Sequence, residues 1–152
     1  MSDEAATRLD AFIDRYSPDV AATARDALAR LRARLGWADV LVYDNYNALA
    51  IGFSPSDRAG EAFLSIALYP RWMNLFFLRG AELDDPAALL KGKGSRVRHV
   101  RLVAADLLER KEIEALVAAT LDQAGLSPPP GRAGRLIVKS VSANQRPRRP
   151  AA

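Results

Sequence analysis

Two neighbouring segments, 68-LYPRWMNLFFLRG-80 and 89-LLKGKGSRVRHVRL-102, decide the fold. The first holds a strand-like run at 72–79, and Pro70 presets a tight turn that pairs this run with the one at 62–69. In the second, Val100 and Leu102 alternate with His99 and Arg101, as in a strand with one buried face. The two segments therefore predict consecutive strands of an antiparallel sheet.

Further elements follow on either side of this pair. The runs 40–43 and 48–53 flank four turn-forming residues and predict a hairpin. Helical spacing of apolar residues predicts helices over 9–16, 17–35 and 113–121, and a short one over 85–90. We therefore expect an α+β domain: one antiparallel sheet of about five strands with N- and C-terminal helices packed against it.

Apolar alternation indicates which side chains form the core. The run Leu75–Leu78 is apolar on both faces, which is typical of a strand that is central in its sheet or covered on both sides. We expect Leu28, Leu64, Ile66 and Phe76 to be buried.

Composition describes one ordinary globular domain. The chain has 152 residues, of which 49% are hydrophobic and 26% charged. It has no cysteine, which excludes disulfides, thiol nucleophiles and thiolate metal sites. No apolar run approaches the roughly 20 residues of a membrane helix, and the acidic start is unlike a secretory signal. We expect a cytoplasmic protein that does not enter membranes.

The basic charge is concentrated at the C-terminus. Residues 126–152 hold 6 of the 22 basic residues and none of the 18 acids. The prolines at 128–130 cannot continue a helix and predict a linker. We expect a domain over 1–126, then a linker and tail over 127–152, in which 135–139 adds an edge strand. Arg146, Arg148 and Arg149 are expected to be exposed and either to aid solubility or to attract nucleic acid.

The loop before the fifth strand is the first candidate site. It carries Lys91, Lys93, Arg96, Arg98 and Arg101 with no acid among them. Its glycines free backbone amides to face an anion, and arginine forks grip phosphate or carboxylate. We expect Lys93, Arg96, Arg98 and Arg101 to bind an anion; the alternative is a solvated connector.

Aromatic residues at turns complete the candidate site. Tyr43, Tyr46, Tyr69 and Trp72 lie at strand ends, where such side chains either line a pocket or close the rim of the core. Tyr69 and Trp72 precede the strand next to the basic loop. We therefore add Tyr43, Tyr69 and Trp72 to the expected ligand-binding residues.

The sequence lacks the motifs of a serine-triad enzyme and of a phosphate-binding loop. The chain has one histidine, His99, and no G-x-S-x-G elbow. The spacing of a phosphate-binding G-x-x-x-x-G-K-[ST] loop is also missing. We expect a binding protein that is not an enzyme and has no resident metal or cofactor.

The two opening segments, together with 135-RLIVKSVSANQRPRRP-150, resemble the YdhG-like family. These small bacterial domains of unknown function are grouped by fold with the YjbR and frataxin (CyaY) proteins. The resemblance covers about residues 12–124 and the tail, and implies helices packed on one face of an antiparallel sheet. Some members are labelled iron chaperones, but the resemblance supplies no catalytic residues.

An iron site would need several oxygen ligands close together. Asp10 and Asp14 lie one helical turn apart, and a second acidic group comprises Glu109, Glu112 and Glu114. Basic residues interleave with both groups, as on a solvated helix face. The sequence therefore favours binding of a small anionic ligand or a protein partner through 91–101. A nucleic-acid-associated protein using its tail is the alternative, and an iron chaperone comes third.

Overall fold

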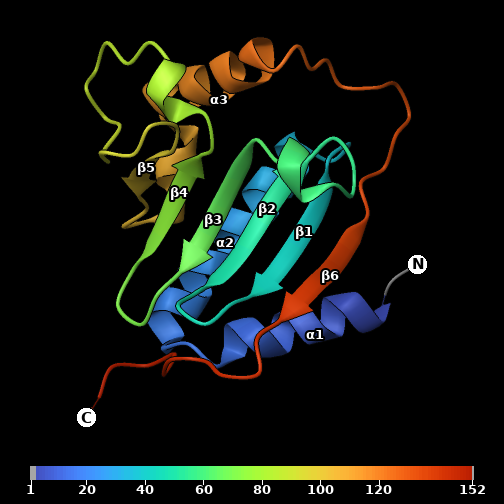
Figure 1. Ribbon diagram of the computed structural model, residues 1–152, viewed down its shortest axis with the longest axis vertical. Helices are drawn as coiled ribbons and strands as arrows, with labels where there is room; N and C mark the ends of the chain where they lie inside the picture. The colour runs from blue at the N-terminus through green and yellow to red at the C-terminus, as the bar shows by residue number, and fades with distance from the viewer. Residues whose placement is uncertain (1–2, 152) are drawn as a thin grey trace.

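The computed structural model describes residues 3–151 (Figure 1). This part of the chain forms one six-stranded sheet, three α-helices and three short 3-10 helices, η1 to η3. Their order is α1 (Asp3–Asp14), α2 (Pro18–Arg34), β1 (Asp39–Asp44), β2 (Leu49–Ser54), η1 (Ala59–Glu61), β3 (Leu64–Leu68), β4 (Met73–Phe77), η2 (Gly80–Glu82), β5 (Arg98–Arg101), η3 (Ala105–Glu109), α3 (Lys111–Gln123) and β6 (Leu136–Val141).

The strand order in the sheet is β5-β4-β3-β2-β1-β6. Strands β1 to β5 pair antiparallel in chain order, and β6 pairs parallel with β1. The predicted α+β class with a single sheet is confirmed. The prediction of about five antiparallel strands is wrong for the sheet as a whole. The segment expected as an edge strand at 135–139 lies in β6, which pairs parallel with β1 at the sheet edge and makes the six-stranded sheet mixed.

The parallel pairing of β6 depends on contacts around the start of β1. The carboxylate of Asp39 is fully buried and accepts hydrogen bonds from the Arg135 amide at 2.8 Å and from the guanidinium groups of Arg135 and Arg132 at 2.9 and 3.1 Å. Gly134 lies so close to β1 that an added Cβ would be 1.7 Å from the carbonyl oxygen of Ala38. These contacts align β6 beside β1.

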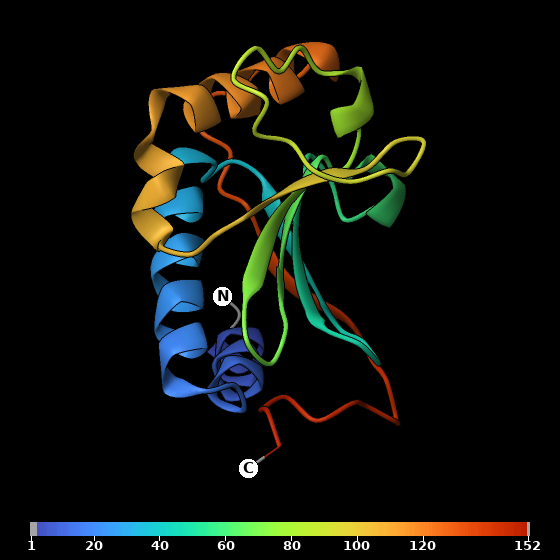
Figure 2. The same ribbon diagram turned by 90° about the vertical axis from the view of Figure 1, so that its left-hand side faces the viewer.

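Helices α1 and α2 lie on one face of the sheet, and α3 lies across its upper end (Figures 1 and 2). The core forms between these helices and the inward side chains of the strands, including Leu28, Leu64 and Ile66 as predicted. None of the helices in residues 3–151 is long and apolar enough to cross a membrane.

Among the described residues, no α-helix covers the opposite face of the sheet (Figure 2). Phe77 points into the core and is fully buried, whereas Phe76, one residue earlier, lies on the opposite face and is only partly buried. The prediction that Phe76 is buried is therefore wrong. Of the two alternatives for its strand, β4 is central, lying between β3 and β5, and is not covered on both sides. Because β4 is apolar on both faces, the ring of Phe76 is left partly exposed on this second face.

Residues 85–90, predicted as a short helix, form only a hydrogen-bonded turn with no helix. The carboxylate of Asp85 accepts hydrogen bonds from the amides of Leu89 and Leu90 at 3.0 and 2.8 Å, and Ala88 has a left-handed φ of 55°. A side chain that takes up amides in this way competes with helical hydrogen bonding. The helix prediction fails for this reason.

Candidate functional site

The uncovered sheet surface, which we call the open face, carries two aligned rows of residues. Small residues occupy the middle of both rows. The β4 side carries Asn74 and Phe76, and the β5 side carries Arg101 and His99. The rows are Tyr43–Ala50–Ala67–Asn74–Arg101 and Leu41–Gly52–Ser65–Phe76–His99.

A hollow of about 540 Å³ lies over the middle of the open face. We call it the sheet hollow. Its floor includes the small residues Ala50, Ser65 and Ala67, and its walls include Tyr46, Tyr69 and Phe76. The ring centroids of Phe76 and His99 are 5.5 Å apart, which extends the aromatic surface onto β5. Small side chains between aromatic walls leave room for a flat group against the sheet.

A second, larger hollow continues from the first. We call it the basic aromatic groove; its volume is about 940 Å³. It contains three arginines and three aromatic residues and no acid, and it shares Tyr46, Asn47 and Tyr69 with the sheet hollow. Its lining is Tyr46, Asn47, Tyr69, Pro70, Arg71, Trp72, Gln145, Arg146, Pro147, Arg149, Pro150 and Ala151.

The aromatic rings of the groove form ordered pairs with one another and with arginines. Tyr69 and Trp72 are stacked, with centroids 5.7 Å apart. The guanidinium of Arg101 lies 4.6 Å from the Trp72 ring, and that of Arg146 lies 5.8 Å from the Tyr46 ring. Burial raises the pKa of the Tyr69 hydroxyl above its ordinary value.

The C-terminal tail forms one wall of the groove and is fixed by Arg148. This guanidinium is buried and donates to Asp44 Oδ1 at 2.9 Å and to the carbonyl oxygen of Asn45. The Arg146 amide donates to the carbonyl of Tyr46 at 2.9 Å. The expected exposure is thus confirmed for Arg146 and Arg149 and wrong for Arg148, because Arg148 neutralises a buried carboxylate. The domain boundary at 126 stays a prediction.

The structure divides the predicted site residues between two places. Tyr69 and Trp72 line the groove, with Arg101 against the Trp72 ring, while Tyr43 lies on the open face. Lys93 and Arg96 belong instead to the loop before β5, and Arg98 is the first residue of β5. None of these four basic residues forms an ion pair within residues 3–151.

Arg98, the first residue of β5, holds the preceding loop. Its guanidinium donates to the carbonyl oxygens of Gly94 and Val97, the second at 2.9 Å. Val100 and Leu102 continue the face on which Arg98 lies, away from His99 and Arg101. Arg98 therefore holds the loop and faces away from the groove.

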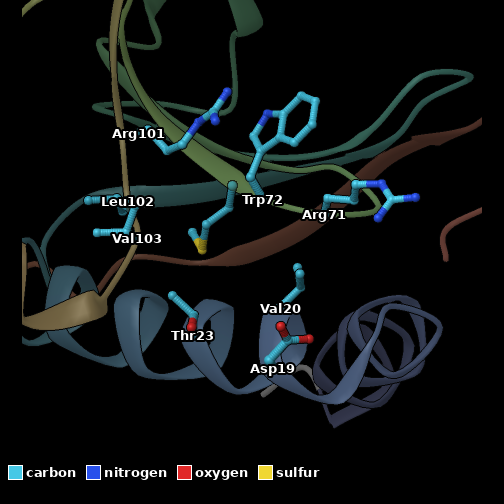
Figure 3. A pocket seen from close by; sticks show the side chains of 9 residues that line it. Asp19, Val20, Thr23, Arg71, Trp72, Arg101, Leu102 and Val103 are labelled. Atoms are coloured by element: carbon cyan, nitrogen blue, oxygen red, sulfur yellow. The ribbon is translucent and has the colours of Figure 1, made fainter. Parts of the chain in front are cut away.

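A third cavity, of about 450 Å³, lies between α2 and the ends of β4 and β5 (Figure 3). Asp19, Val20 and Thr23 point from α2 toward the strands, whereas Arg101 and Trp72 lie beside each other on the other side of the strands. Arg71 and Trp72 line both this cavity and the groove. The β3–β4 turn therefore separates a side with an acidic residue from the basic aromatic side.

The acidic groups considered for iron are engaged with arginines. Arg25 Nη2 is 2.9 Å from Asp10 Oδ1 and 3.7 Å from Asp14 Oδ1. Glu109 and Glu114 each lie 3.0 Å from Arg34. In the part of the chain that the structure describes, no three His, Cys, Asp or Glu side chains gather in a way that could hold a metal ion. These side chains add nothing in favour of an iron-binding proposal.

Arg71, Arg146 and Arg149 were not among the predicted site residues. Arg71 could have been found, since it stands between Pro70 and Trp72 in the turn already chosen. The tail arginines carry no comparable signal, because the chain pattern does not show that residues 145–151 return to the turn after β1. Tertiary contacts bring them there, among them those of Arg148 and Gln145 with Asp44 and of the Arg146 amide with Tyr46.

Comparison with models of known protein families, with curated proteins and with solved structures gives no match. The YdhG-like resemblance and the iron-chaperone label therefore stay predictions from the sequence.

Proposed function

We propose that this protein binds an anionic ligand with a planar part, and that it does so in the basic aromatic groove. The observation that carries the proposal is the lining of the groove: Arg71, Arg146 and Arg149 beside Tyr46, Tyr69 and Trp72, with no acid. Guanidinium groups bind phosphate or carboxylate through paired hydrogen bonds, and aromatic rings stack on a flat group. The groove therefore offers groups that bind the anion and rings that stack on the planar part of the same ligand.

The proposal shifts the centre of the predicted site from residues 91–98 to the β3–β4 turn and the tail. Arg101, Tyr69 and Trp72 are retained from the predicted set. The groove lining contains no histidine, lysine, serine or carboxylate, so it offers no nucleophile beside a base. We therefore propose a binding protein and not an enzyme.

Isothermal titration calorimetry with a nucleoside monophosphate tests this proposal. Such a ligand carries a doubly charged phosphate and a flat base, and its affinity should fall as salt rises. Arg71→Ala with Arg146→Ala should weaken binding at least tenfold, whereas Arg58→Ala is the matched control. Arg58 is exposed, pairs with Glu61 and is not among the groove residues. The proposal would be refuted if the double variant and the Arg58→Ala control lost affinity equally. It would also be refuted if the unmodified protein did not bind the nucleoside monophosphate.

A further inference from the structure

The basic aromatic groove and the sheet hollow form one continuous path across the surface. They meet at Tyr46, Asn47 and Tyr69, and together they run from the C-terminal tail to Phe76 on the open face. No aspartate or glutamate lines either of them. A mononucleotide would occupy only part of this combined path, so the surface has room for a longer ligand.

Basic residues lie at both ends of the path. Arg71, Arg146 and Arg149 are at the tail end. At the other end, His99 on the open face is bridged by backbone hydrogen bonds of 2.8 and 2.9 Å to Lys91, the first residue of the basic loop. Lys91, Lys93 and Arg96 are exposed there. This spacing of positive charge suits a chain of phosphates better than one compact anion.

Between these ends the open face offers flat stacking surface. Phe76 and His99 form one ring pair, and Tyr69 and Trp72 form another. Ala50, Ser65 and Ala67 keep the intervening floor low. Successive bases of a single strand stack on aromatic side chains while a basic groove tracks their backbone. Paired bases of a duplex do not present their faces in this way.

From these observations we infer that the anionic ligand is a single-stranded nucleic acid, with phosphates along the groove arginines and bases on the open face. The inference rests on the proposed function, since the same groove binds the phosphates. It goes further in assigning Phe76 and the sheet hollow to the bases.

Fluorescence anisotropy with labelled oligothymidylates of 4, 8 and 12 nucleotides tests the inference, with a 12-base-pair duplex alongside. We expect affinity to increase with length and the 12-nucleotide strand to bind more tightly than the duplex. Phe76→Ala should weaken binding of the 12-nucleotide strand about tenfold, the size expected for losing one stacking ring. Arg146→Ala should lower the slope of log affinity against log salt by about 1.

Arg58→Ala is the control for loss of charge, and the melting temperature of each variant shows that it is folded. If the protein binds a nucleoside monophosphate but its affinity for oligothymidylates does not increase with their length, the inference is overturned and the proposed function stands. Equal affinity for the duplex, or full affinity in folded Phe76→Ala, would likewise overturn it. Failure to bind both the monophosphate and the oligonucleotides would overturn the two together.

Discussion

Replacing Arg148 by alanine should strongly destabilise the protein, although only four residues follow it in the sequence. The Arg148 and Asp44 side chains are each 2% exposed, and their charged atoms are 2.9 Å apart. The guanidinium of Arg148 also lies 5.7 Å from the ring of Tyr16, a core residue. The substitution removes this guanidinium and leaves the carboxylate of Asp44 buried.

The expected cost follows from that uncompensated charge. Removing one partner of a buried ion pair costs about 3–5 kcal/mol. The remaining partner of Asp44 is Arg15, 3.5 Å away and about half-exposed, so we expect a loss near the lower end, about 3 kcal/mol. For a domain of this size, this loss corresponds to a fall in melting temperature of about 10 °C.

Urea denaturation followed by circular dichroism measures this loss. Arg149→Ala is the matched control, because Arg149 is exposed and its guanidinium donates to the carbonyls of Asp14 and Arg15 without pairing with an acid in residues 3–151. Its cost should stay below about 1 kcal/mol. Asp44→Asn added to Arg148→Ala should recover part of the stability, since it removes the stranded charge. A cost below about 1 kcal/mol for Arg148→Ala would refute the reasoning that the tail is anchored through this pair.

Three further predictions test the fold by the same denaturation assay. Phe77→Ala should cost about 3–5 kcal/mol because the ring is fully buried, and Phe76→Ala should cost clearly less; equal costs would contradict the assigned faces of β4. Burial alone would raise the pKa of Asp39, but hydrogen bonds from Arg135 and Arg132 outweigh it and lower the pKa from 3.8 to about 2. This group therefore stabilises the fold by about 2 kcal/mol above pH 4 and loses that contribution as the pH falls from about 4 to 2; Asp39→Asn should flatten this part of the stability profile. Gly134→Ala should be destabilising because its Cβ would overlap the Ala38 carbonyl, whereas Gly60→Ala meets no atom within 4 Å and should be tolerated.

The strands that pair with chain neighbours could be predicted from the sequence because their signals are local. Alternation placed Leu64 and Ile66 in the core, and Pro70 correctly marked the turn between β3 and β4. Alternation could not decide between Phe76 and Phe77, since both are apolar and a shift of one residue exchanges the two faces.

The position of β6 depends on contacts between residues far apart in the chain. Asp39 meets Arg132 and Arg135, more than 90 positions later, and Asp44 meets Arg148 across 104 positions. A basic tail after prolines has the composition of a solvated extension. The sequence therefore located the positive charge but did not place Arg146 and Arg149 in one groove with Tyr46 and Trp72. The tail side of the groove could not be predicted for this reason.

The most direct test of the account is a nuclear magnetic resonance titration with a nucleoside monophosphate, following the two tryptophan indole N–H signals and the arginine side-chain N–H signals. Trp72 lines the groove, whereas Trp37 is buried against Phe63 and serves as the internal reference. We predict saturable shifts of Trp72, Arg71 and Arg146 and a stationary Trp37 signal. Saturable shifts confined to residues 91–98, with Trp72 and Arg146 unmoved, would contradict the claim that the groove is the binding site.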